Sequence, residues 1–107
     1  MSFLLRSIVE LANLPDLRYL YLQQNLFIGR VPAELGTLEN LRHLDVGNNH
    51  LVSTIRELIR IEGGFSVLRN LYLNNNYLGG GIPAQLANLT NLEIFFSHTL
   101  FFYFSCF

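Results

Sequence analysis

A leucine pattern that occurs three times restricts the folds that this chain can adopt. It begins at Leu17, Leu41 and Leu68 and reads LRYLYLQQNLFIGRVPAEL, LRHLDVGNNHLVSTI and LRNLYLNNNYLGGGIPAQL. The shared frame is L-x-x-L-x-L-x-x-N-x-L-x-G-x-I-P-x-x-L-x-x-L, in which valine, isoleucine or phenylalanine can replace leucine. A repeat of this length buries its apolar face only by stacking on its neighbours. The pattern therefore predicts a stack of similar coils around one continuous core.

The first repeat contains a segment with the alternation of a half-buried strand. Its leucines, Leu20 and Leu22, should face the core, whereas Tyr19, Tyr21 and Gln23 should face outward. Corresponding strands of adjacent coils lie about 4.8 Å apart, so equivalent outward residues form rows across a parallel sheet. The expected rows are Tyr19, His43 and Asn70; Tyr21, Asp45 and Tyr72, with Phe96 as a further candidate; and Gln23, Gly47 and Asn74.

An asparagine follows each of these strands at the same position of the frame. The three residues are Asn25, Asn49 and Asn76. A side-chain amide can both donate to and accept from backbone groups that stacking would leave without partners. We therefore expect these asparagines to form a structural ladder inside the turns.

The frame and its G-x-I/V-P segment resemble the leucine-rich repeats of the plant extracellular subclass, over about residues 8–93. The resemblance implies an α/β solenoid, a right-handed superhelix with a parallel β-sheet on its concave side and short helical or irregular segments on its convex side. Plant receptors and receptor-like proteins of this kind recognise proteins or peptides. The resemblance thus implies a binding module rather than an enzyme.

The repeat frame divides one domain, residues 1–107, into five parts. They are a partial repeat at 8–16, repeats at 17–40, 41–67 and 68–91, and a degenerate repeat with a hydrophobic tail at 92–107. The second repeat carries an insertion. There the spacing of apolar residues predicts a helix over Ile55–Glu62, capped by Ser53 or Thr54 and ended by Gly63 and Gly64.

The phenylalanine-rich tail follows no repeat rule, and two interpretations of it stay open. The tail can cover the open end of the stack, or it can derive from a truncated or mis-spliced reading frame. In either case its apolar residues would allow the chain to self-associate.

Composition excludes several classes of protein. Only 14% of the residues are charged and the net charge is −1, so the chain lacks the basic surface of a nucleic-acid-binding protein. Its single cysteine, Cys106, excludes an internal disulfide and a cysteine-rich zinc site. Half of the residues are hydrophobic, which excludes a disordered chain.

Neither a signal peptide nor a transmembrane helix is expected in this chain. The apolar patch Phe3–Leu5 is interrupted by Arg6 and is too short for a signal peptide. The uncharged segment Ile94–Phe107 is shorter than the roughly 20 residues of a spanning helix. An extracellular or cell-surface location, with membrane association only through a longer parent protein, is implied by the resemblance alone.

Catalysis, a cofactor and a metal site are not expected. Catalytic groups need an enclosed pocket that shifts pKa values and excludes water. His43 and Asp45 share one face, but that face is an open sheet with no nucleophile in register. The other two histidines, His50 and His98, are isolated in the frame.

The expected function is non-catalytic binding of a protein or peptide on the concave face. Aromatic and amide side chains on a rigid sheet bury contact area at a low cost in conformational entropy. The candidate binding residues are Tyr19, Tyr21, Gln23, His43, Asp45, Asn70, Tyr72 and Asn74. Two alternatives stay open, namely a fragment of the ectodomain of a membrane-bound receptor kinase and a non-functional truncated product.

Two further features accompany the expected binding face. Arg18, Arg42 and Arg69 form a row beside the strands, and either ion pairs with acidic neighbours or an anionic partner would compensate their charge. The triplet Asn88-Leu89-Thr90 is an N-glycosylation sequon that the frame places on the convex side. Asn88 is therefore a possible glycosylation site.

Overall fold

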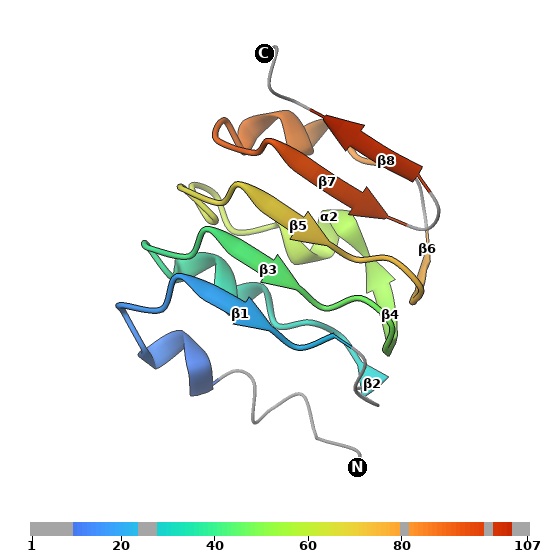
Figure 1. Ribbon diagram of the computed structural model, residues 1–107, viewed down its shortest axis with the longest axis horizontal. Coiled ribbons are helices and arrows are strands. Elements are labelled where there is room, and N and C mark those ends of the chain that lie inside the picture. Colours follow the sequence, from blue (N-terminus) through green and yellow to red (C-terminus); the bar gives the residue numbers. More distant parts are fainter. Residues whose placement is uncertain (1–9, 24–27, 80–81, 98–99, 104–107) are drawn as a thin grey trace.

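The structure, a computed structural model, describes residues 10–23, 28–79, 82–97 and 100–103. Its main sheet has the strand order β1-β3-β5-β7-β8. These strands are β1 (Tyr19–Tyr21), β3 (His43–Asp45), β5 (Asn70–Tyr72), β7 (Ile94–Ser97) and β8 (Leu100–Tyr103). The first four run parallel, one from each successive coil, as Figure 1 shows. The predicted parallel sheet and solenoid are confirmed.

The register of the main sheet stacks each inward side chain on the next. Leu20 pairs with Leu44, Leu44 with Leu71, and Leu71 with Phe95. Leu44, Leu71 and Phe95 have no exposed surface, and Leu20, in the first strand, is 8% exposed. Phenylalanine thus replaces leucine in the fourth strand without interrupting the core.

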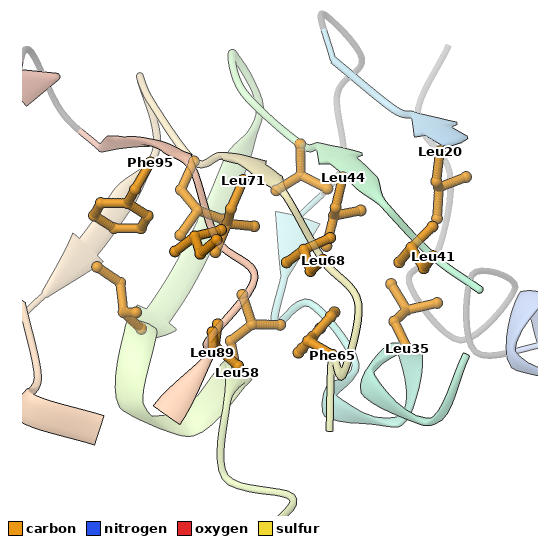
Figure 2. Packing of buried hydrophobic residues seen from close by; sticks show 14 of the residues in the cluster. Leu20, Leu35, Leu41, Leu44, Leu58, Phe65, Leu68, Leu71, Leu89 and Phe95 are labelled. Carbon is orange, nitrogen blue, oxygen red and sulfur yellow. The ribbon is translucent and has the colours of Figure 1, made fainter. Parts of the chain in front are cut away.

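Short helical segments form the layer behind the main sheet (Figure 1). They are η1 (Glu10–Asn13), η2 (Ala33–Thr37), α2 (Ile55–Leu58) and η3 (Ala84–Asn88). The core lies between these segments and the strands. Figure 2 shows side chains from the two layers meeting there, including Leu35, Leu58, Phe65 and Leu89 from the helical side.

The helix of the second repeat is shorter than predicted, because it ends at Leu58 rather than Glu62. Thr54 caps it as expected, since its hydroxyl accepts a hydrogen bond from the backbone N–H of Glu57 at 3.1 Å. Beyond the helix, the backbone N–H of Phe65 donates to the carbonyl oxygen of Gly36 at 2.8 Å. This bond ties the returning chain to the preceding coil, and the inserted residues form turns instead of further helix.

A second sheet, which the sequence analysis did not predict, lies beyond the carboxyl ends of the main strands (Figure 1). It consists of β2 (Ile28–Gly29), β4 (His50–Thr54) and β6 (Tyr77–Gly79), and all its pairings are parallel. Ile28, Val52 and Tyr77 are exposed on it. The His50 and Tyr77 rings stack with centroids 5.8 Å apart.

The tail contributes a strand to the edge of the main sheet. β8 folds back antiparallel on β7, with the pairs running from Ile94 and Tyr103 to Ser97 and Leu100. The backbone of β8 therefore pairs with the edge of the last parallel strand. His98 and Cys106 lie outside the described residues. In the part of the chain that is described, no helix has the length and apolar character needed to cross a membrane.

Candidate functional site

The concave face is formed by the outward side chains of β1, β3 and β5. The register pairs Tyr19 with His43 and His43 with Asn70, and it pairs Tyr21 with Asp45 and Asp45 with Tyr72. The first two expected rows therefore exist as continuous rows. The tyrosines of the first strand are the most exposed members, at 57% for Tyr19 and 58% for Tyr21. The expected extension of the second row is Phe96, whose backbone pairs with that of Tyr72.

Three rings from three strands form a continuous aromatic cluster on this face. The ring of His43 lies 4.5 Å from that of Tyr21 and 5.3 Å from that of Tyr72, centroid to centroid, and is tilted by 33° and 40°. These separations are within the range in which aromatic pairs attract each other. His43 sits on the central strand and so joins the tyrosines of the outer two. We call Tyr21, His43 and Tyr72 the aromatic cluster.

The surroundings of His43 favour its neutral form. The side-chain amide nitrogen of Asn70 lies 3.2 Å from His43 Nδ1. Because an amide nitrogen only donates, Nδ1 accepts and the proton of the neutral ring is on Nε2. That Nε2 atom is buried and has no hydrogen-bond partner among the described residues. Burial lowers the pKa of His43, and the nearby carboxylate of Asp45 opposes this effect.

The carboxylate of Asp45 is partly used within its own turn. Its Oδ1 accepts a hydrogen bond from the backbone N–H of Gly47 at 3.0 Å. This bond fixes the side chain and leaves the other carboxylate oxygen as an acceptor for a ligand. Asp45 is thus a pre-oriented acceptor beside the aromatic cluster.

The third row depends on a glycine. A Cβ added to Gly47 would lie 2.7 Å from Oδ1 of Asn74, which is closer than a Cβ atom normally approaches another heavy atom, so the amide of Asn74 would have to shift. The absence of a side chain at Gly47 therefore lets the amide of Asn74 lie across the middle coil. Gln23 and Asn74 are both half-buried at the ends of this row.

The expected asparagine ladder is formed by inward-pointing amides in the described turns. Asn49 is 5% exposed, and its Nδ2 donates to the carbonyl oxygens of Leu22, Val46 and Gly47 at 2.9–3.1 Å. Asn76 repeats two of these contacts within its own coil and also donates to the carbonyl oxygen of the preceding coil's Val46 at 3.0 Å. Asn25 lies outside the described residues.

The arginine row is not neutralised as the ion-pair hypothesis requires. Arg18, Arg42 and Arg69 are exposed at the amino ends of the three strands, and their backbones are linked in sequence at 2.8 Å. Within the described ranges, the ion pairs shorter than 4.0 Å all involve Arg60. No ion pair joins this row to Asp16 or Glu39 among the described residues, so the hypothesis is wrong. Glu93 continues the row, since its backbone N–H donates to the carbonyl oxygen of Arg69 at 2.8 Å.

The aromatic cluster lies on an open face of the sheet. The described residues contain no group of three or more histidine, cysteine, aspartate or glutamate side chains that could hold a metal ion. The aromatic cluster and Asp45 stand on an open sheet, where water is not excluded.

Comparison with known proteins identifies the family. The sequence profile of the Leucine Rich Repeat family matches residues 16–38, 40–60 and 67–89, which together are more than half of the chain. The chain is a leucine-rich repeat protein. Curated relatives of this leucine-rich repeat protein include plant receptor-like proteins and receptor kinases.

A probable LRR receptor-like serine/threonine-protein kinase of Arabidopsis thaliana is 37% identical over 84 residues, covering 78% of the chain and 11% of the relative. The crystal structure of the Arabidopsis receptor kinase HAESA with the peptide hormone IDA and the co-receptor SERK1 matches with a TM-score of 0.75 and 30% identity. That match covers 85% of this chain and 15% of HAESA.

The LRR ectodomain of the Arabidopsis membrane receptor kinase GASSHO1/SCHENGEN3, in complex with CASPARIAN STRIP INTEGRITY FACTOR 2, matches with a TM-score of 0.68 and 37% identity. The match covers 84% of this chain and 10% of the GASSHO1/SCHENGEN3 chain. The leucine-rich repeat protein therefore spans 10–15% of the length of these relatives and structures.

Sequence reasoning missed two features of this leucine-rich repeat protein that affect its surface. One is the second sheet with its stacked His50 and Tyr77, for which the β-branched residues Val52 and Thr54 were an available signal. The other is Phe65, which occupies the corner position that Leu38 and Leu89 occupy in the other coils. Its signal was its spacing of three residues before Leu68.

Proposed function

We propose that this leucine-rich repeat protein binds an extended peptide or protein segment on its concave face. The observation that carries the proposal is the aromatic cluster, in which His43 links Tyr21 and Tyr72 across three strands. Aromatic side chains held by a rigid sheet supply contact area without losing much conformational freedom on binding. Tyr19 and Tyr21 are each more than half exposed, so this area is available to a partner.

Charge on the face supports a partner that carries carboxylates as well as apolar groups. The exposed row of Arg18, Arg42 and Arg69 lies beside the aromatic cluster and has no ion pair in the described structure. Guanidinium groups bind carboxylates through paired N–H donors. Asp45 lies on the opposite side of His43 from this row and provides an acceptor for backbone N–H groups of the peptide.

The similar structures support a peptide as the partner. HAESA is described in complex with a peptide hormone, and the GASSHO1/SCHENGEN3 ectodomain in complex with an integrity factor. By analogy with those ectodomains, this module acts outside the cell or at its surface, and it binds without catalysing a reaction. Because the chain spans 10–15% of the length of such receptors, it would supply one section of a longer concave surface.

A phage-displayed library of random linear peptides, selected on the immobilised chain, tests the proposal. Peptides that bind should lose at least about tenfold in affinity, about 1.4 kcal/mol, when Tyr21, Asp45 and Tyr72 are all changed to alanine. A matched control changes three exposed convex residues, Arg56, Glu62 and Gln85, to alanine. Failure to enrich any peptide, or equal affinities for the two triple variants, would contradict concave-face binding.

A further inference from the structure

We propose that Asn88 carries an N-linked glycan whose first sugars pack into a convex-side groove made by the insertion of the second repeat. The inference rests on the extracellular location proposed above. It assigns a modification to Asn88 and a function to the insertion, neither of which the binding face requires.

The groove lies between the turns that follow α2 and the helix η3 of the next coil. It has a volume of about 720 Å³, which is within the range of roughly 300–1,000 Å³ that ligand pockets span. Its lining includes Arg56, Ile59, Glu62, Gln85, Asn88 and Leu89. The insertion supplies one wall of the groove. Its turns run from Ile59, just after α2, to Phe65, where the chain bonds the preceding coil again.

The sequon lies on the rim of this groove. Asn88 is the last residue of η3, and both Asn88 and Thr90 line the groove and are exposed. Within the described structure, the side-chain amide of Asn88 makes no hydrogen bond that glycosylation would break. A sugar attached to its Nδ2 atom would therefore begin at the mouth of the groove.

Glycosylation at this position requires a lipid-linked oligosaccharide pyrophosphate as donor. A bond forms between Nδ2 of Asn88 and the anomeric carbon of the first sugar. The bond from that carbon to the pyrophosphate oxygen breaks, the lipid pyrophosphate leaves with the electron pair, and the amide nitrogen loses one proton.

The charges in the groove favour a neutral ligand over an anion. Arg60 is already paired with Glu57 at 3.3 Å and with Glu34 at 3.5 Å. Glu62 in the same lining further offsets the charge of Arg56. A neutral sugar can use both signs, because its hydroxyl groups donate to carboxylates and accept from guanidinium groups.

The apolar part of the lining suits an N-acetylated sugar. Ile59, which is half-buried, offers a surface for the acetyl methyl group or the C–H face of the sugar ring, while Gln85 can bond the acetamide. Because the glycan is tethered at the rim, its local concentration is in the millimolar range or above, and weak contacts are enough to hold it.

The test is secretion of the full chain from a eukaryotic host that adds high-mannose glycans. Intact-mass measurement should show a glycan on the wild-type chain and none on Asn88→Gln. A high-mannose-specific endoglycosidase should then remove the glycan about tenfold more slowly from the native chain than from the denatured chain, a ratio that corresponds to about 1.4 kcal/mol of glycan–groove contact. The double change Arg56→Ala and Gln85→Ala should abolish most of this protection.

A matched control moves the sequon to the first helical turn. Asn13 ends η1 as Asn88 ends η3, and it does not line the groove. The combination Pro15→Thr with Asn88→Gln creates a sequon there, whose glycan should be trimmed equally fast in both states. An unglycosylated wild-type chain, or equal trimming of the Asn88 glycan before and after denaturation, would overturn the proposal.

Measuring peptide binding on the same variants distinguishes failure of the glycan proposal from failure of the proposed peptide-binding function. Asn88→Gln should leave the affinity for library peptides unchanged, because the groove and the concave face lie on opposite sides of the sheet. Loss of glycan protection with intact peptide binding would contradict the glycan proposal alone. A protected glycan on a chain that binds no peptide would contradict the binding proposal alone.

Discussion

The ring of Phe65 packs tightly against the position that a side chain on Gly36 would take. Its Cδ2 and Cε2 atoms lie 3.2 Å from the position of a Gly36 Cβ, and its backbone N–H bonds the Gly36 carbonyl oxygen at 2.8 Å. Phe65 is 2% exposed and has a positive φ of 52°, which is rare for a bulky residue. The packing against Gly36 therefore holds the insertion in a backbone conformation that is unfavourable by itself.

Gly36→Ala should lower the free energy of unfolding by about 1 kcal/mol. The crowding of Phe65 costs about 1–3 kcal/mol, whereas alanine recovers roughly 0.5–1 kcal/mol of backbone entropy. Urea titrations of Gly36→Ala, Phe65→Leu and the double variant measure the coupling. The double variant should lose less than the sum of the single losses, because leucine relieves the crowding; additive losses would show that the two residues do not interact.

Asn49→Ala should destabilise the chain by about 2–3 kcal/mol. It removes the donor that the carbonyl oxygens of Leu22, Val46 and Gly47 share, and loss of a buried hydrogen bond is costly even though the Val46 oxygen keeps its bond from the amide of Asn76. Asn91→Ala is the matched control, because the amide of Asn91 also donates to one carbonyl oxygen, that of Ser66, but is exposed. We expect a loss within about 0.5 kcal/mol for the control. Similar losses for both variants in urea titrations would contradict a special role for Asn49.

Thr54→Ala should lower the free energy of unfolding by about 1 kcal/mol, because α2 then loses its N-terminal cap. Thr54→Ser keeps the hydroxyl and should retain most of the stability. Thermal unfolding monitored by circular dichroism compares the two variants. Equal losses would mean that the methyl group of Thr54, rather than its hydroxyl, stabilises this corner.

The stability of the chain should decrease on acidification in a way that depends on His43. Burial lowers the pKa of His43 below its ordinary value of 6.5, so below that pH the unfolded chain binds more protons than the folded chain. The free energy of unfolding therefore falls as the pH drops through 6.5 toward the lower folded-state pKa, and it is not affected by His43 above this window. Protonation would also place an N–H on Nδ1, facing the amide nitrogen of Asn70.

Melting temperatures at about pH 7.5 and about pH 5.5 check this dependence. His43→Gln should show a smaller decrease between the two conditions than the wild-type chain. His50→Gln, which changes an exposed histidine on the second sheet, serves as the control and should behave as the wild type. An unchanged decrease in His43→Gln would show that other groups cause it.

Much of the fold could be predicted because the same frame positions recur in three repeats and each repeat confirms the others. Leu20, Leu44 and Leu71 occur at the same frame position, so their stacking follows from any regular superposition of the coils. The outward rows follow from the same superposition. The second sheet was not predictable in this way, since its strands are short and lie in the variable part of each repeat.

The sequence predicted which residues lie on the candidate binding face, but not the contacts between their side chains. The frame places Tyr21, His43 and Tyr72 on one surface, and their contribution to ligand binding stays a prediction. Their association into a cluster depends on side-chain rotamers and on the diagonal offset between strands, which the frame does not contain. The same applies to the arginine row, because the frame does not contain the side-chain conformations that decide whether its ion pairs form.

The sequence by itself determined the stack of coils, the inward leucine row and the faces on which polar residues lie, because these depend only on periodicity. Tertiary structure decided where the inserted residues go. The helix ends at Leu58, and the bond and packing between Phe65 and Gly36 fix where the returning chain meets the preceding coil. Contacts between coils, which no single repeat encodes, therefore shaped the groove beside Asn88 and the aromatic cluster on the concave face.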